Sequence, residues 1–119
     1  MSNPGPLQVP TTAVELLPTP LPSNMTVLDV REPYEWDAGH IEGAVHIPLS
    51  DLPRRMGELD GERPVLCVCK VGARSAQAVL FLRSRGLDAV NLHGGMLAWS
   101  AAGRPVAAVS SPWEPHALP

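Results

Sequence analysis

The residues best suited to chemistry lie in one short segment, Cys69 to Ser75, which reads CKVGARS. It combines a cysteine with two cationic side chains, Lys70 and Arg74, and with Gly72. Backbone N–H groups in a tight turn can converge on an anion, and a helix that follows adds the positive end of its dipole. Gly72 permits the backbone angles that such a turn needs. Because these features stabilise a thiolate, the nucleophilic form of cysteine, Cys69 is predicted to be a reactive thiol.

The elements on either side should place this thiol at the end of a buried strand. Residues 65–69 are the most hydrophobic short run of the chain and predict a central strand with both faces covered. A helix is predicted from Ser75 to Arg85, with Gly86 as the residue that ends it. In an open parallel sheet, functional sites lie beyond the carboxyl ends of the strands. Cys69 is expected at such an end.

The rest of the chain alternates between predicted strands and helices. Strands are predicted at 27–30, 44–47 and 89–92, and helices at 34–38, 51–59 (capped by Ser50) and 95–102. Between Gln8 and Leu17 we expect a short strand and one or two helical turns, capped by Thr11 or Thr12. This alternation predicts an α/β sandwich with a mainly parallel sheet. Residues 1–7 are expected to be a disordered start and the proline-rich residues 107–119 a tail, on either side of a domain at 8–106.

Length and charge narrow the class of protein. A chain of 119 residues allows one domain, and it has no apolar run of the roughly 20 residues that cross a bilayer. Its net charge is −3, and no basic cluster larger than Arg54-Arg55 occurs, so we expect no nucleic-acid or membrane partner. The first basic residue is Arg31, which argues against a signal peptide and for a cytoplasmic protein. Cys67 and Cys69 are too close to suggest a secreted disulfide framework and are expected to be reduced.

The length of the cysteine loop bears on its substrate. In the phosphate cradle of protein tyrosine phosphatases, five residues separate the cysteine from the arginine, whereas here four separate Cys69 from Arg74. A loop one residue shorter forms a tighter bowl. It suits a terminal sulfur atom on the cysteine better than a whole phosphate.

Four segments, in order, resemble the signatures of a known family. They are LDVRE at 28–32, GHIEGAVHIP at 39–48, CKVGARS at 69–75 and LHGGMLAW at 92–99. In these segments the chain resembles a single-domain rhodanese, a thiosulfate sulfurtransferase-type domain, from about Gln8 to Val106. The resemblance implies a three-layer α/β sandwich with a mainly parallel central sheet flanked by helices.

The resemblance also implies a reaction and a set of site residues. Cys69 would take sulfur from thiosulfate or a persulfide donor, carry it as a persulfide, and pass it to cyanide, a small thiol or a protein thiol. The substrate-binding loop would consist of Lys70, Val71, Gly72, Ala73, Arg74 and Ser75. No metal and no organic cofactor is implied. Two alternatives stay open: a cysteine-dependent phosphatase or arsenate reductase, and a non-catalytic partner-binding module.

Several residues near this loop have simpler interpretations. Asp29 and Arg31 are expected to form a structural ion pair or loop brace, and Arg74 to reach a carboxylate such as Asp29 or Glu32. Cys67 is interpreted as a core residue, with a resolving thiol as the alternative.

The histidines and tryptophans also have a simple interpretation. The four histidines show no metal-ligand spacing, although His93 follows a strand and is a conceivable general base. Trp36 and Trp99 are expected in the core, and Trp113 at the surface. The oligomeric state is left open.

Overall fold

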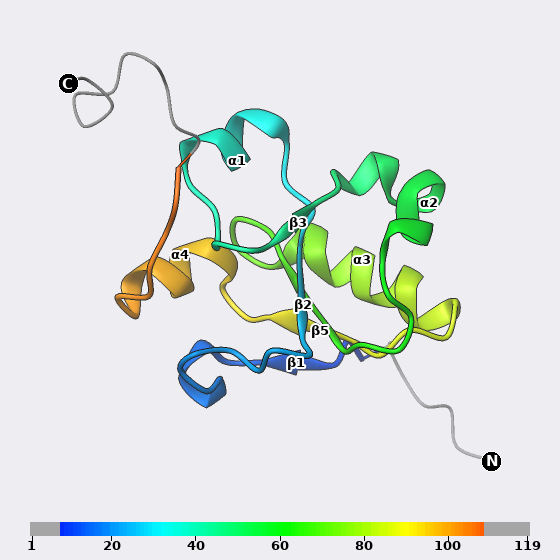
Figure 1. Ribbon diagram of the computed structural model, residues 1–119, viewed down its shortest axis with the longest axis horizontal. Helices are drawn as coiled ribbons and strands as arrows, with labels where there is room; N and C mark the ends of the chain where they lie inside the picture. The colour runs from blue at the N-terminus through cyan, green and yellow to red at the C-terminus, as the bar shows by residue number, and fades with distance from the viewer. Residues whose placement is uncertain (1–7, 109–119) are drawn as a thin grey trace.

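The computed structural model describes residues 8–108, whose five strands form a single parallel sheet in the order β1-β5-β4-β2-β3 (Figure 1). The strands are β1 (Thr11–Thr12), β2 (Thr26–Asp29), β3 (Val45–His46), β4 (Val65–Val68) and β5 (Ala89–Leu92). The predicted α/β fold with a mainly parallel sheet is confirmed. The strand that precedes Cys69, β4, lies in the middle of the sheet, as expected.

Helices cover both faces of this sheet. They are α1 (Pro33–Ala38), α2 (Leu52–Arg55), α3 (Ala73–Ser84) and α4 (Gly95–Ala101), and Figure 1 shows α2 and α3 on one side and α4 on the other. Successive residues of β4 enter different cores, because side chains alternate across a strand. Cys67 packs with α2 and α3, whereas Leu66 packs with α4. The result is the three-layer sandwich that the resemblance implied.

The helix predicted at 51–59 is wrong in its extent. The segment consists of a 3₁₀ turn (Leu49–Asp51), one α-helical turn (α2) and a second 3₁₀ turn (Met56–Glu58). Pro53 has no backbone N–H to donate to the Leu49 carbonyl, so a regular α-helix cannot run from the first 3₁₀ turn through this residue. Ser50 lies inside the first 3₁₀ turn and makes no cap.

The N-terminal helix is shorter than expected and begins differently. Only Val14–Leu16 form a 3₁₀ turn, and the residue before it, Ala13, makes no side-chain cap. Thr11 and Thr12 are not caps, because they form β1 and pair with Asn91 and Leu92 of β5. These two residues therefore take part in the hydrogen bonding between β1 and β5 at the edge of the sheet instead of capping a helix.

At the other end of the fold, the chain is held to α1's end by backbone pairing. Ala107 exchanges two backbone hydrogen bonds with His40, at 2.7 and 2.8 Å. The sequence analysis placed Ala107 at the start of the tail. Trp113 and most of the two predicted ends lie outside the described residues. Among residues 8–108, no helix is long and apolar enough to span a bilayer.

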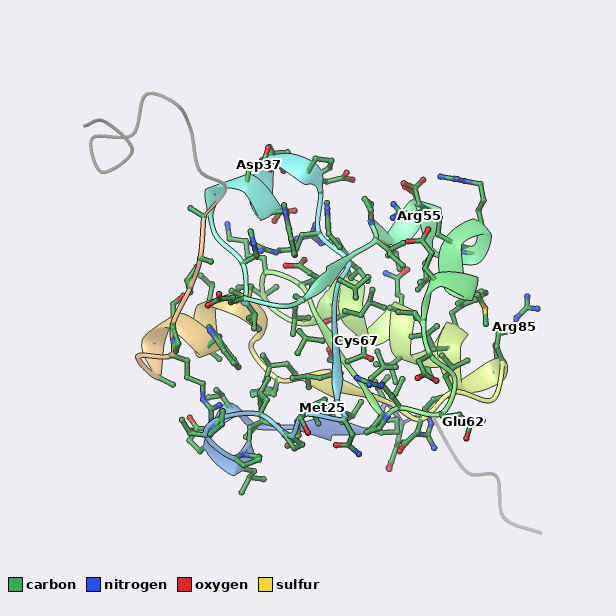
Figure 2. The ribbon with its side chains drawn as sticks, in the orientation of Figure 1. Met25, Asp37, Arg55, Glu62, Cys67 and Arg85 are labelled. Carbon is green, nitrogen blue, oxygen red and sulfur yellow. The ribbon has the colours of Figure 1, made fainter. Side chains whose placement is uncertain are left out.

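Cys67 is a core residue. Figure 2 shows it in the interior of the molecule, its exposed fraction is 0%, and both cysteines are free thiols. Burial raises the pKa of the Cys67 thiol to about 12. A thiol that ionises so poorly is a weak nucleophile, which supports the packing interpretation.

We expect Cys67→Ser to lower the free energy of unfolding by about 1–3 kcal/mol, because it buries a hydroxyl in an apolar layer. Cys67→Ala should cost less, since it leaves only a small cavity. Urea denaturation of both variants measures the difference. A Ser variant at least as stable as the Ala variant would show that the site accommodates a polar group.

Candidate active site

Cys69 is the first residue after β4, and the chain turns around its sulfur before α3 begins. The residue is 1% exposed. Gly72, at φ +112°, precedes the first residue of α3, and its N–H donates to Cys69 Sγ at 3.0 Å. The Ser75 hydroxyl lies 3.3 Å from the same sulfur. The left-handed backbone at Gly72 is the conformation for which the sequence suggested a glycine.

The surroundings of Cys69 favour its thiolate. Burial by itself raises the pKa of the thiol, because it removes water from the charged form. Hydrogen bonds from the Ser75 side chain and from the backbone N–H groups of Ser75, Gly72 and Val71 act in the opposite direction and prevail. The pKa of Cys69 therefore lies below its ordinary value, whereas that of Cys67, two residues earlier, lies above.

Arg74 is fixed by α1, not by the end of β2. Its Nη1 and Nη2 donate to Glu35 Oε1 and Oε2 at 2.6 and 2.9 Å. The hydrogen bond from Arg74 is the main reason why the pKa of Glu35 falls to about 2, and the pKa of Arg74 is raised in turn. Arg74 thus binds a carboxylate, as expected, but the two suggested partners, Asp29 and Glu32, are wrong. A two-pronged contact of this kind fixes the plane of the guanidinium beside the loop.

Asp29 is unavailable to Arg74 because Arg31 occupies it. The Arg31 side chain donates to both carboxylate oxygens of Asp29, at 2.7–3.1 Å, and to the carbonyl oxygen of Gly39 at 2.7 Å. Both residues are buried. The predicted ion pair is thus present, and it ties the end of β2 to the end of α1.

Trp36 is not a core residue, contrary to the prediction. It is partly exposed and stacks with His40 and His46, at ring-centroid distances of 3.6 and 4.7 Å. His46 Nε2 also lies 2.8 Å from the Arg31 carbonyl oxygen. Aromatic stacking here joins α1 to β3 and so supports the helix that carries Glu35. Trp99 is buried as predicted, at 3% exposure.

The start of α4 closes the site from the other side. The backbone N–H of Met96 donates to the Cys69 carbonyl at 2.8 Å, and that of Leu97 to the Lys70 carbonyl at 3.1 Å. Gly95 lies against the loop with φ +54°, and a Cβ there would lie 2.3 Å from the Cys69 carbonyl oxygen. In the sequence, Gly95 is the first residue of the helix predicted at 95–102 and part of a family signature, but its contact with the loop was not predicted. The available signal was the pair Gly94-Gly95 between a predicted strand and a predicted helix.

The remaining loop residues face outward. Lys70, Val71 and Ala73 are exposed, and Lys70 borders a pocket of about 390 Å³ between α1 and α4. Apolar side chains form much of its lining, among them Tyr34, Met96, Leu97 and Val106. His93 is exposed and follows β5 at the same edge of the sheet. In the described part of the chain, no group of three His, Cys, Asp or Glu side chains is placed to hold a metal.

Asn91 is a residue of the site that sequence reasoning missed. It belongs to β5, is 7% exposed, and contacts both Ser75 and the Gly72 carbonyl. Its only signal in the sequence was a polar residue inside an otherwise apolar strand.

These features match a known family. Residues 12–102 match the model of the rhodanese-like domain, and the chain belongs to that family. The solution structure of the rhodanese-like domain of the Anabaena Alr3790 protein is similar, with a TM-score of 0.76 and 31% identity. That alignment covers 91% of this chain and 86% of the Anabaena chain.

Two relatives are informative about function. A sulfurtransferase of Allochromatium vinosum is 38% identical over 86 residues, which is 71% of this chain and 80% of the relative. The HTH-type transcriptional regulator Rv0324 of Mycobacterium tuberculosis is 40% identical over 98 residues, and the alignment covers 80% of this chain but 43% of the regulator. The family and its relatives named as sulfurtransferases support a sulfur-transfer role.

We expect Glu35→Gln to lower the free energy of unfolding by about 1–2 kcal/mol at pH 7, because Arg74 loses a charged partner in a partly buried site. The pKa of Glu35 is lower in the folded protein than in the unfolded chain. The stabilisation by its carboxylate is therefore present above about pH 4.5 and is lost as the pH falls toward about 2. Urea denaturation from pH 7 to pH 2.5 should show the two proteins converging. The control is Glu15→Gln, at an exposed position. A difference in the free energy of unfolding between wild type and Glu35→Gln that stays constant with pH would contradict the ion pair as its cause.

We expect Gly95→Ala to be strongly destabilising, by about 2–4 kcal/mol, since its Cβ would collide with backbone atoms of Cys69 and Lys70. The matched control is Gly61→Ala, where a Cβ meets nothing within 4 Å. Thermal unfolding compares the two. Equal melting temperatures would mean that α4 can move away from the loop at little cost.

Proposed function

We propose that this chain is a sulfurtransferase that carries the transferred sulfur as a persulfide on Cys69. The observation that supports the proposal most is the set of hydrogen-bond donors on Cys69 Sγ, which lowers the pKa of a buried thiol. The thiolate is the nucleophilic form of cysteine, and a lowered pKa increases its share. The relatives named as sulfurtransferases agree with this role.

In the first step, the Cys69 thiolate attacks the outer sulfur of thiosulfate or of a persulfide donor. A bond forms between the two sulfur atoms, the donor's S–S bond breaks, and sulfite or a thiolate leaves with the electron pair. Lys70, exposed beside Cys69, supplies a positive charge for the anionic donor. Arg74 adds guanidinium N–H donors rather than net charge, because Glu35 pairs with it and fixes its direction. The chain itself needs no metal or organic cofactor for this step.

In the second step, a thiophilic acceptor attacks the outer sulfur of the persulfide. The S–S bond breaks, and its electron pair returns to Cys69 Sγ. Cyanide, a small thiol or a protein thiol would serve as acceptor. We place the reaction in the cytoplasm, where thiols stay reduced.

Loop length favours this reaction over phosphate chemistry. Four residues separate Cys69 from Arg74, and the Gly72 N–H already points at the sulfur. A cradle this tight suits one additional sulfur atom. Assay of a phosphate ester or of arsenate tests the phosphatase and arsenate reductase alternatives.

Intact-mass spectrometry after thiosulfate treatment tests the proposal. We expect the wild-type chain to gain one sulfur atom, cyanide to remove it, and Cys69→Ser to gain none. Cys67→Ala is the matched control and should behave as the wild type does. A folded wild type that gains no sulfur from thiosulfate or from an organic persulfide would contradict the proposal and favour a partner-binding module.

A further inference from the structure

Asn91 and Ser75 form a short hydrogen-bonded chain that ends at the Cys69 sulfur. Ser75 Oγ lies 2.5 Å from Asn91 Oδ1 and 3.3 Å from Cys69 Sγ. Asn91 Nδ2 lies 3.0 Å from the carbonyl oxygen of Gly72. Ser75 is 0% and Asn91 7% exposed, so water does not readily replace these bonds. A polar side chain of β5 thus contacts one of α3, and the α3 side chain contacts the Cys69 sulfur.

The direction of each hydrogen bond follows from the groups themselves. The Gly72 carbonyl can only accept, so Asn91 turns its NH₂ group toward it and its Oδ1 toward Ser75. Because Oδ1 also can only accept, the Ser75 hydroxyl must supply the hydrogen of the 2.5 Å contact. A serine hydroxyl has one hydrogen. Two acceptors, Asn91 Oδ1 and an ionised Cys69 sulfur, therefore need the same hydrogen.

We propose that Asn91 competes with the Cys69 sulfur for the Ser75 hydrogen and thereby restrains the ionisation of Cys69. In the thiol state, the S–H of Cys69 donates to Ser75 Oγ while Ser75 donates to Asn91, so every group is satisfied. In the thiolate state, the Ser75 hydrogen turns toward Sγ and the buried Oδ1 loses its donor. The hydrogen bond that stabilises the thiolate is thus partly offset by the cost of leaving the buried Asn91 oxygen without a donor.

The inference deepens the proposed function and takes its catalytic meaning from it. A persulfide has a neutral bridging Sγ, which is a weak acceptor, so the hydroxyl turns back to Asn91. When an acceptor removes the outer sulfur, the electron pair of the S–S bond moves to Sγ, and the hydroxyl turns to stabilise the departing thiolate. Asn91 acts through Ser75 and is a positioning residue.

The side-chain hydrogen bonds of Asn91 go to Ser75 and to the Gly72 carbonyl, and to no charged side chain of the described residues. The charged or titratable side chains on or next to the elements around the sulfur are Asp29, Arg31, Tyr34, Glu35, Asp37, His46, Cys67, Lys70, Arg74, Arg83 and His93. Two of them are bound to partners outside the polar chain: Arg74 to Glu35, and Arg31 to Asp29. Substitutions at Asn91 and Ser75 therefore address the hydroxyl hydrogen itself.

The test measures the pKa of Cys69 from the pH dependence of its alkylation by iodoacetamide, followed by intact mass in a Cys67→Ala background. Ser75→Ala should raise the pKa by about one unit, because it removes a donor to the thiolate. Asn91→Leu should lower it by about half a unit to one unit, because the Ser75 hydrogen is released to Sγ. Asn91→Asp should raise it by about one unit or more, since it keeps an acceptor and adds negative charge.

The two Asn91 variants control for each other. Both lose the N–H bond to the Gly72 carbonyl, so a loosened loop would shift the pKa in the same direction in both. In addition, the lowering by Asn91→Leu should disappear in Ser75→Ala. A pKa that rises or stays constant in a folded Asn91→Leu, or that shifts equally with and without Ser75, would overturn the proposal. Alkylation needs no sulfur donor, so this result is independent of whether the chain transfers sulfur.

Discussion

A buried sulfur atom can hold negative charge only where hydrogen-bond donors replace the water it has lost, and the architecture around Cys69 meets this constraint. The donors come from the turn and the first residues of α3: the N–H of Gly72 and the hydroxyl of Ser75. Both depend on a left-handed backbone at Gly72. The contrast with Cys67, whose pKa burial raises to about 12, shows what the same strand does to a thiol without such donors.

The elements around the loop are arranged to hold that turn in place. Backbone N–H groups at the start of α4 donate hydrogen bonds to the carbonyls of Cys69 and Lys70. From β5, the side-chain NH₂ group of Asn91 donates to the Gly72 carbonyl. On the opposite side, α1 holds Arg74 through Glu35. Every contact joins segments distant in sequence, so the geometry of the site follows from the sheet order that brings β2, β4 and β5 together.

Local pattern sufficed for much of the fold and for the position of Cys69 at the start of the loop. Hydrophobic runs and glycine positions located β4, α3 and the loop at 69–75, because these depend on neighbouring residues. Partners across the sheet were not predictable in this way. Acidic residues at 29, 32 and 35 all lie in the segment from which a partner of Arg74 could come. Two features of the structure decide among them: Arg31 binds Asp29, and α1 holds Glu35 beside Arg74. Asn91 and Trp36 were likewise defined by contacts that no local spacing encodes.

The pairing of charges at the site has a consequence for how anions reach it. Among the described residues, Arg31 and Arg74 each pair with a carboxylate, whereas the exposed Lys70 beside Cys69 has no ion pair. A single exposed charge is screened within about 8 Å at physiological ionic strength. Long-range steering is therefore weak, and encounter rates should depend little on salt. Under the proposed function, an anionic donor would then be selected by contact with the loop, after it has reached the site.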